Sequence, residues 1–282
     1  IAAHDCVGSN IYAHVLRGTV KRVVPRENEA INETWISDRD RFSYEGIYSD
    51  ERLMSPMIKK DDQWQEISWK DALIEIVEKL KVVKKNSAAV LASPNSTLEE
   101  FYLLSRLSDE LSISNIDHRL RMVDFTDQLN DPKIPLLGMN IAEIENCKQI
   151  VVVGSDIRKE APIIGHRIRK AALSGAQIGI INENINEYFF DVAVYLSESI
   201  IGNLLGLLSA LNGEPPEEMR DIFKQIKPTK EQQKLAAILN SKDKKHLILG
   251  HLAINHPYAS VIRLLSAKIA ELTGAVLGFI TE

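Results

Sequence analysis

The chain has 282 residues and a net charge of −5, from 34 basic and 39 acidic side chains, with 45% hydrophobic and 26% charged residues. This is the balance of an ordinary globular protein of about two domains, which excludes a disordered chain or a fibre. A mildly acidic chain with both signs interspersed also lacks the basic patches of a duplex nucleic-acid clamp, so we expect no nucleic-acid partner.

Cysteine content and hydropathy exclude two further classes. Two cysteines, Cys6 and Cys147, are too few for a disulfide framework and fit a reducing compartment. The longest apolar stretches, 199–213 and 246–262, are interrupted by asparagine, histidine or proline, so we expect no direct membrane span. The sequence begins without Met or a basic signal region and stops at Glu282 just after an apolar run, and we therefore expect a segment of a longer chain.

The first 46 residues predict a small β-rich module. Two strand-like runs, 11–16 and 19–24, flank Arg17-Gly18, a step typical of a tight hairpin. Pro25 ends the second run, because proline cannot donate to a strand ladder. The polar segment that follows shows little periodicity.

The next stretch predicts two helices separated by a strand. Ser68 is a good N-cap for a helix whose apolar residues recur at helical spacing over 69–80. A short apolar run at 88–92 is typical of a buried strand, and Ser96 or Thr97 caps the second helix.

The clearest pattern lies at 149–182, where an apolar strand, a helix and a second apolar strand indicate a βαβ unit with parallel strands. A similar pattern closes the chain, with a strand at 246–249 and a helix at about 258–272. This alternation predicts a doubly wound, mainly parallel α/β fold over 47–282, after the β-rich module of residues 1–46.

One turn has the position of a ligand-binding loop. Gly154, Ser155 and Asp156 follow the strand at 149–153, and open α/β sheets bind ligands at the carboxyl ends of their strands. Neither the dinucleotide fingerprint G-x-G-x-x-G nor the P-loop pattern is present. Two interpretations stay open, a tight turn that needs glycine and a loop whose free amides bind a phosphate.

No other motif predicts catalysis. The seven histidines have no H-E-x-x-H or H-x-E spacing, and G-x-S-x-G is absent. Cys147 precedes a buried strand and is expected to be a small core residue. The run Asp38–Arg41 alternates in charge, and we expect a local network of weak surface ion pairs there. Cys6 alone cannot hold a four-iron cluster, which needs four thiolates.

Several short stretches carry a family resemblance, and they are Asp5–Asn10, Arg17-Gly18, Arg22–Arg26, Ile31–Gly46, Ser68–Leu73, Val153–Asp156, Glu160–Pro162, Arg167–Lys170 and Leu272–Ala275. Together they closely resemble the large iron–sulfur subunit of respiratory complex I, known as the G subunit in bacteria and as the 75 kDa subunit in mitochondria. The later stretches are shared with the wider molybdopterin oxidoreductase family, whose α/β domains the chain is expected to share.

In that family the N-terminal module often binds a four-iron cluster through four cysteines. Laid onto this sequence, the four ligand positions fall at Ala2, Asp5, Ser9 and Ser37, and Cys6 is one place out of register. The resemblance therefore implies a degenerate module without a metal site, and no cofactor in this segment. The subunit's two-iron and four-iron clusters are expected in a more N-terminal portion.

In molybdenum enzymes of the wider family, strand-end loops hold two pterin nucleotides, and a Cys, selenocysteine or Ser side chain ligates the metal. The matching region here, around Asp124–Leu129, contains no cysteine. The resemblance to complex I implies that no molybdenum cofactor is bound and that no residue is catalytic. It leaves Gly154, Ser155 and Asp156 as a vestigial strand-end loop.

The resemblance implies a structural part of the peripheral arm of NADH-quinone oxidoreductase, peripheral on the cytoplasmic face of the bacterial inner membrane. Its expected partners are the flavin-containing NADH-binding subunit and neighbouring iron–sulfur subunits. Two alternatives stay open, a catalytic domain of a molybdenum or tungsten bis-pterin oxidoreductase and a small-molecule binding module that uses the Gly154 turn. Metal analysis distinguishes the first alternative from the structural role, and thermal shift with nucleotides tests the second alternative.

Overall fold

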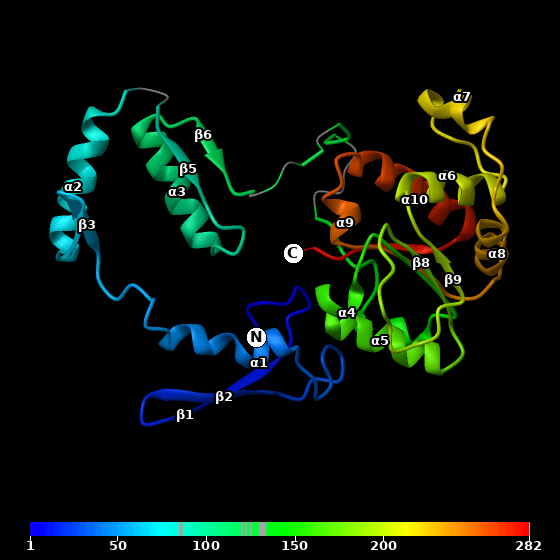
Figure 1. Ribbon diagram of the computed structural model, residues 1–282, viewed down its shortest axis with the longest axis horizontal. Helices are drawn as coiled ribbons and strands as arrows, with labels where there is room; N and C mark the ends of the chain where they lie inside the picture. Colours follow the sequence, from blue (N-terminus) through cyan, green and yellow to red (C-terminus); the bar gives the residue numbers. More distant parts are fainter. Residues whose placement is uncertain (85–86, 120, 122, 125, 130–133, 282) are drawn as a thin grey trace. The chain divides into compact units, whose positions relative to one another are not determined.

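The computed structural model describes residues 1–84, 87–119, 121, 123–124, 126–129 and 134–281. Contacts divide the chain into two compact units, Ile1–Tyr44 with Val123–Glu282 as the first and Glu45–Met122 as the second (Figure 1). The first 44 residues thus share a unit with the C-terminal part of the chain. The sequence-based division into 1–46 and 47–282 stays a prediction.

The N-terminal module is a hairpin followed by short helical turns. Strands β1 (Ile11–Leu16) and β2 (Thr19–Pro25) pair antiparallel, as predicted. Arg17 and Gly18 between them both have positive φ, 52° and 77°, which matches the twist that a two-residue hairpin turn requires. Helix α1 (Asp38–Phe42) and the 3₁₀ helix η1 (Ser43–Tyr48) follow.

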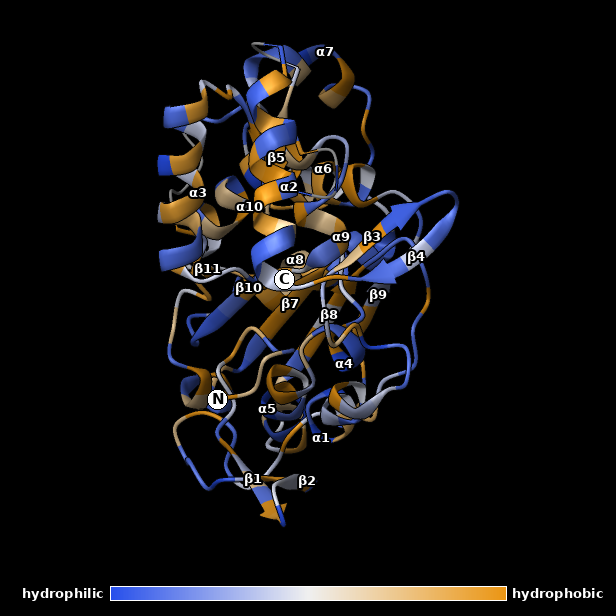
Figure 2. Cartoon of the chain, turned by 90° about the vertical axis from the view of Figure 1, so that its left-hand side faces the viewer, coloured by the Kyte–Doolittle hydropathy of each residue, from blue (hydrophilic) through white to orange (hydrophobic). Residues whose placement is uncertain are grey.

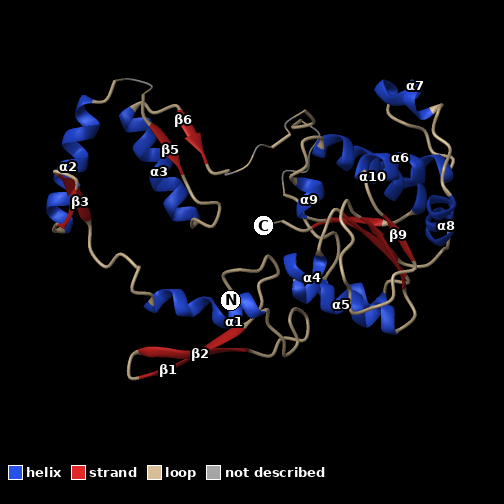
Figure 3. Cartoon of the chain, in the orientation of Figure 1, coloured by secondary structure: helices blue, strands red, loops and turns tan. Residues whose placement is uncertain are grey.

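The rest of the first unit is an α/β domain, whose elements in chain order are η2 (Ile141–Asn146), β7 (Gln149–Val153), α4 (Ile157–Glu160), α5 (Pro162–Leu173), β8 (Gln177–Ile181), β9 (Val194–Leu196), α6 (Ile200–Ala210), η3 (Glu217–Met219), α7 (Arg220–Phe223), α8 (Lys230–Leu239), β10 (Lys245–Leu249), α9 (His251–Ile254), α10 (Ala259–Thr273) and β11 (Val276–Phe279). Its five strands form one parallel sheet in the order β11-β10-β7-β8-β9. Figure 3 shows the strands of this domain in red beside its helices in blue.

Alternation along the strands builds a core on each face of this sheet. Ile150 and Val152 of β7 face a cluster that includes α5, while Val151 and Val153 face a cluster that includes α6, α8 and α10. All four side chains have no exposed surface. Since helices cover both faces of a parallel sheet, the predicted doubly wound α/β class with a small N-terminal β module is confirmed.

The strand order reverses at β7. The chain leaves β7 toward β8 and β9, then returns through α6 and α8 to place β10 on the other side of β7. The carboxyl ends of β7 and β10 are therefore the switch point at which doubly wound sheets bind ligands.

The second unit contains β3 (Met57–Lys60), β4 (Gln63–Glu66), α2 (Trp69–Val82), β5 (Ala89–Leu91), α3 (Leu98–Leu111) and β6 (Asn115–Asp117). The predicted caps form, since the hydroxyl of Ser68 accepts from the Asp71 amide and Thr97 makes a capping box with Glu100. Strands β3 and β4 form an antiparallel hairpin, and β5 and β6 pair parallel.

The apolar stripes of the second unit form as helical patterns predict, but they are not buried. Trp69 and Leu73 of α2 are 72% and 58% exposed, and Leu98 of α3 is 82% exposed. The described part of α2 has no buried residue. Figure 2 shows the hydrophobic residues on these helices and the mainly hydrophilic β3–β4 hairpin. Among the described residues, no helix is long and apolar enough to cross a membrane.

Candidate functional site

The first predicted site, the set of four cluster-ligand positions, is organised around a carboxylate. Asp5 accepts hydrogen bonds from the amides of Val7, Gly8 and Ser9 at 3.2, 3.0 and 3.3 Å. The hydroxyl of Ser9 also donates to Asp5, and the Ala2 amide donates to the Ser9 carbonyl at 2.8 Å. Residues 2–9 therefore wrap around the Asp5 side chain, and three of the four positions belong to one network.

The fourth position, Ser37, is linked to that loop by Asp40, a residue expected from the sequence to lie in a surface ion-pair network. Asp40 accepts from the Ser37 hydroxyl at 2.6 Å and from the His4 amide at 3.2 Å. Asp40 is only 3% exposed. The expected surface ion-pair network over Asp38–Arg41 is wrong at this residue, because the carboxylate turns inward to accept from a hydroxyl and an amide.

The donor set of this site does not fit a four-iron cluster. The four positions present a methyl group, a carboxylate and two hydroxyls, whereas such clusters are held by thiolates. Cys6 has an exposed surface, but the surrounding protein partly desolvates its sulfur, and this desolvation together with the Asp5 carboxylate raises the pKa of its thiol. Within the described ranges, no group of three or more His, Cys, Asp or Glu side chains is arranged to hold a metal ion.

The second predicted site, the turn after β7, is packed tightly against the turn after β10. Gly154 has φ of +60°, and a Cβ there would lie 2.6 Å from the Ala253 nitrogen. A Cβ on Gly250 would lie 2.2 Å from the Cβ of Ser155. Glycine is needed at Gly154 because the backbone of Ala253 approaches it closely, and at Gly250 because the side chain of Ser155 does. The interpretation of Gly154 as a tight turn is therefore supported.

A carboxylate that the sequence analysis did not assign lies at the centre of this switch point. Glu160, the last residue of α4, accepts from the Ser155 hydroxyl at 2.6 Å, the Asp156 amide at 2.9 Å and the His251 amide at 3.1 Å. It thus receives donors from the turns after β7 and β10 together. Free amides at such a turn are the groups that bind a ligand phosphate, and here Glu160 takes them.

Most other polar groups of the strand-end loop are also engaged, but the Asp156 Oδ1 atom is buried and has no hydrogen-bond partner among the described residues. Asn182 and Tyr188 donate to the Ser155 carbonyl at 3.2 and 3.1 Å, and one carboxyl oxygen of Asp156 lies 3.2 Å from the Lys159 ammonium. Ser155 has no exposed surface. The three residues of the vestigial loop are brought together with Glu160, which, after desolvation and Asp5, also raises the pKa of the Cys6 thiol and whose carbonyl accepts from Arg39.

The third predicted region, Asp124–Leu129, is anchored on α10. Asp124 accepts from the Ser260 amide at 2.9 Å and also from the Ser260 hydroxyl, which lowers the pKa of the Asp124 carboxyl. Asp127 forms a bidentate ion pair with Arg263. Phe125 and Asn130 lie outside the described residues. Both described acids of this region hold the chain against a helix.

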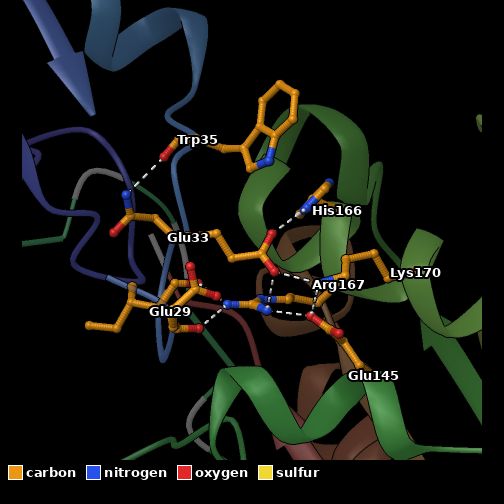
Figure 4. A network of polar contacts seen from close by, with 9 residues as sticks. Glu29, Glu33, Trp35, Glu145, His166, Arg167 and Lys170 are labelled. Atoms are coloured by element: carbon orange, nitrogen blue, oxygen red, sulfur yellow. Dashed lines mark hydrogen bonds and ion pairs between the residues drawn. The ribbon is translucent and has the colours of Figure 1, made fainter. Parts of the chain in front are cut away.

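A network of ion pairs joins the N-terminal module to α5 (Figure 4). Arg167 is 3% exposed, and its guanidinium lies 2.9 Å from Glu33 and also pairs with Glu145. The same guanidinium donates to the carbonyls of Glu29 and Ile31 at 2.6 and 3.0 Å. A buried guanidinium with several acceptors fixes the position of both segments.

Two further α5 side chains extend this network. Lys170 contacts both carboxylates and lies 2.8 Å from that of Glu145, while His166 lies 2.9 Å from that of Glu33. Bonds from Lys170 to both carboxylates lower the pKa values of Glu33 and Glu145 despite their burial, and raise the pKa of Lys170. Arg39 of α1 adds a second anchor, because it donates to the Glu160 carbonyl at 2.9 Å.

A cavity of about 1130 Å³ lies beside this junction. Its lining is mostly backbone and apolar side chains from residues 6–7, 30–31 and 135–143, with further residues near β11. The lining includes the side chain of Lys244, whose ammonium lies 3.4 Å from the carboxylate of Glu143.

Comparisons with protein families give two matches. The model for molybdopterin oxidoreductase matches residues 52–278, and the model described as NADH-ubiquinone oxidoreductase NDSU1/NuoG-like, 4Fe-4S domain, matches residues 1–45. The G subunit of the NADH-quinone oxidoreductase of Rickettsia felis is 34% identical over 183 residues, which are 64% of this chain and 27% of that protein.

Other relatives give the same picture. The NADH-ubiquinone oxidoreductase 75 kDa subunit of Reclinomonas americana is 30% identical over 187 residues, which are 62% of this chain and 27% of that protein. This chain thus spans about a quarter of the length of these curated relatives. Among solved structures, acetylene hydratase from Pelobacter acetylenicus has a TM-score of 0.67 at 14% identity, covering 95% of this chain and 42% of that one. The similarity to this structure shows a shared fold.

Proposed function

The chain belongs to the molybdopterin oxidoreductase family, and we propose that it is a non-catalytic segment of the large iron–sulfur subunit of NADH-quinone oxidoreductase, respiratory complex I. Its role is to support, by shape and contact, the peripheral arm through which electrons pass from NADH to quinone. Its partners are the flavin-containing NADH-binding subunit and neighbouring iron–sulfur subunits. Its place is peripheral, on the cytoplasmic face of a bacterial inner membrane.

One observation carries the proposal. In both places where the fold would hold a cofactor, carboxylates of this chain take the hydrogen-bond donors. Asp5 receives three amides at the cluster-ligand positions, and Glu160 receives two amides and a hydroxyl at the switch point. A cluster or a pterin phosphate would have to displace an anion that already has well-placed donors.

The ion-pair network supports a structural role. Arg167 and Lys170 hold the N-terminal module on the α/β domain through Glu33 and the carbonyls of Glu29 and Ile31. Electron transfer between clusters requires fixed separations, and a module fastened at α5 and again at Arg39 gives a rigid body on which neighbouring subunits can be placed.

The alternative, a catalytic domain of a molybdenum or tungsten enzyme, shares the fold but finds no support in the donor set. The described acids of region 124–129 are bound to Ser260 and Arg263. The clusters of the longer subunit belong, in this proposal, to a portion outside this chain.

Two measurements test the proposal. A tagged full-length protein, purified from its own membranes, should bring with it NADH-oxidising activity and the other iron–sulfur subunits. The 282-residue chain, purified and incubated anaerobically with iron and sulfide, should retain no stoichiometric iron and no molybdenum. Stoichiometric retention of either metal, or a membrane preparation in which the tagged protein is separate from NADH oxidation, contradicts it.

A further inference from the structure

The β1–β2 hairpin has an unusual charge for this chain. Between Asn10 and Glu27 there is no acidic residue, and four basic residues lie there, Arg17, Lys21, Arg22 and Arg26. The whole chain has a net charge of −5. The hairpin is therefore a local positive surface on an acidic protein, and such a surface attracts an acidic partner.

The same hairpin exposes large apolar side chains. Tyr12, Val15 and Leu16 of β1 are 52%, 60% and 60% exposed, and only Ile11 of that strand is half-buried. By contrast β2 contributes Val23, which is 6% exposed. Apolar and aromatic side chains beside arginine are the composition of the centre of a protein–protein interface.

Two of the cations are held on the strand surface and have no carboxylate partner. The Arg22 Nε donates to the His14 Nδ1 at 2.9 Å, and the Arg26 guanidinium lies 5.6 Å from the centre of the Tyr12 ring. Over the described residues, no ion pair joins any of the four basic groups to a carboxylate. Their charge is thus available to another molecule, and their positions are partly fixed.

The outer edge of β1 is also open. In the described part of the chain the sheet consists of β1 and β2 alone. Helix α1 lies on the β2 side, where the Tyr44 hydroxyl donates to the Lys21 carbonyl at 3.0 Å, and β1 lies on the far side of the ribbon from α1 (Figure 1). An exposed strand edge presents unpaired amides and carbonyls, and a further strand can pair with them.

We propose that this edge is a docking site for an extended, acidic segment of another protein chain, which adds as a strand to β1. The backbone of such a segment pairs with β1. Since side chains alternate between the faces of a strand, its carboxylates lie on the face that carries Arg22 and Arg26, and its apolar side chains lie on the opposite face. A lipid bilayer is a poorer partner, because hydrocarbon cannot satisfy an open strand edge. Duplex nucleic acid is poorer too, because four charges in one ribbon neutralise few phosphates.

The second unit supplies a matched control. The β3–β4 hairpin is also two-stranded and carries Lys59 and Lys60, and Trp64 on it is 63% exposed. Its turn, however, contains Asp61 and Asp62, and Lys59 pairs with Asp62 at 2.9 Å. Both hairpins are two-stranded and expose large apolar side chains, and they differ in net charge.

The experiment measures binding of labelled octapeptides to the whole 282-residue chain by fluorescence anisotropy. The probe alternates glutamate and valine, and the reference peptide alternates lysine and valine. Two double variants are compared with the parent chain, Lys21→Glu with Arg22→Glu, and Lys59→Glu with Lys60→Glu. All four positions are exposed, so circular dichroism should show both variants folded like the parent.

We expect the acidic probe to bind the parent chain and the basic peptide not to bind. The β2 charge reversal should weaken the acidic probe at least about tenfold, and the β3 reversal less than about twofold, since opposing charges steer and hold the partner. Raising the salt from about 50 to about 500 mM should weaken binding by screening. Isotope-edited spectra should show the β1 amides becoming protected.

Three results overturn the proposal. One is no binding of the acidic probe, and another is equal loss in both double variants. The third is tighter binding to phosphatidylglycerol vesicles or to an RNA oligonucleotide that the β2 reversal abolishes, which would assign the surface to lipid or nucleic acid. Copurification with NADH-oxidising activity is a separate readout, so the docking site and the proposed function can fail independently.

Discussion

Replacement of Glu160 by alanine tests the account of the switch point. In the native protein its carboxylate accepts from the Ser155 hydroxyl at 2.6 Å and from the amides of Asp156 and His251 at 2.9 and 3.1 Å. Alanine removes all three acceptor contacts while leaving the donors in place. The turns after β7 and β10 then have no common partner.

The expected loss follows from those contacts. A buried donor left without an acceptor costs about 1–3 kcal/mol. The Ser155 hydroxyl can rotate to another acceptor, whereas the two amides cannot move, and Glu160 is half-buried, so that water reaches part of the space. We therefore expect Glu160→Ala to lower the free energy of unfolding by about 3 kcal/mol, or the Tm by roughly 9 °C for a domain of this size.

The assay is urea unfolding followed by tryptophan fluorescence, together with amide hydrogen exchange. Exchange should accelerate at Asp156 and His251, whose amides bond to Glu160. Glu160→Gln should fall between parent and alanine, because its amide oxygen accepts one donor while its NH₂ group meets another. The control is Glu187→Ala, since the Glu187 side chain is 79% exposed and lies 3.9 Å from Arg158, a pair worth less than about 0.5 kcal/mol.

Two results would refute the reasoning. A loss below about 1 kcal/mol for Glu160→Ala would show that the carboxylate is not needed by its donors. Unchanged exchange at Asp156 and His251 would show that other groups satisfy these amides. In either case the switch point would be open to a ligand, and the non-catalytic proposal would lose its main support.

Three further predictions concern other parts of the first unit. Burial lowers the pKa of His246 to about 4, whereas its value in the unfolded chain is near 6.5. The contribution of neutral His246 to the free energy of unfolding is therefore complete above pH 6.5 and falls by about 3 kcal/mol as the pH drops to 4. His246→Gln, which keeps a donor for the Leu137 carbonyl at 2.7 Å, should flatten this part of the pH profile of urea unfolding, and an unchanged slope would contradict the assignment. Arg167→Met leaves the carbonyls of Glu29 and Ile31 without their buried donor, while Lys170 still pairs with Glu33 and Glu145. It should destabilise the protein by about 2–3 kcal/mol, with limited proteolysis appearing first in residues 1–44, whereas cleavage elsewhere would show that the network does not hold the module. A variant of the Cys6→Ser chain with cysteine at all four cluster-ligand positions carries Ala2→Cys, Asp5→Cys, Ser9→Cys and Ser37→Cys. It should bind iron and sulfide and turn brown, whereas the Cys6→Ser chain should not. A colourless product would show that the four positions do not converge.

The sheet could be predicted from sequence because its central strands are buried on both faces. Continuous apolar runs at 149–153 and 177–181 leave little choice of structure, and both became strands with the predicted bounds. Strand β9 was missed, because it has only three residues and lies between polar segments. Helices α2 and α3 were predicted from apolar residues at helical spacing. Such spacing predicts a helix but does not show which surface packs against its apolar face.

The carboxylates that organise the two sites could not be predicted in the same way. Glu160 ends a four-residue helix, and no periodicity indicates that its side chain turns back toward two strand ends. Asp40 lies in an alternating run of charge, which normally favours the surface, yet its two acceptor bonds form 3 and 36 residues away. A local sequence pattern shows that a carboxylate is present, but the hydrogen-bond donors that it binds are known only from the folded structure.

The three amides held by Asp5 have a consequence for how this sequence can change. Exchange of Asp5 alone for a thiol would leave those amides without an acceptor and would still not bring iron, because three other positions lack sulfur. This single step toward a metal-binding version of the loop is therefore expected to be less stable than the present loop. The position resists stepwise substitution, and a route to the metal-binding form would require several exchanges at once.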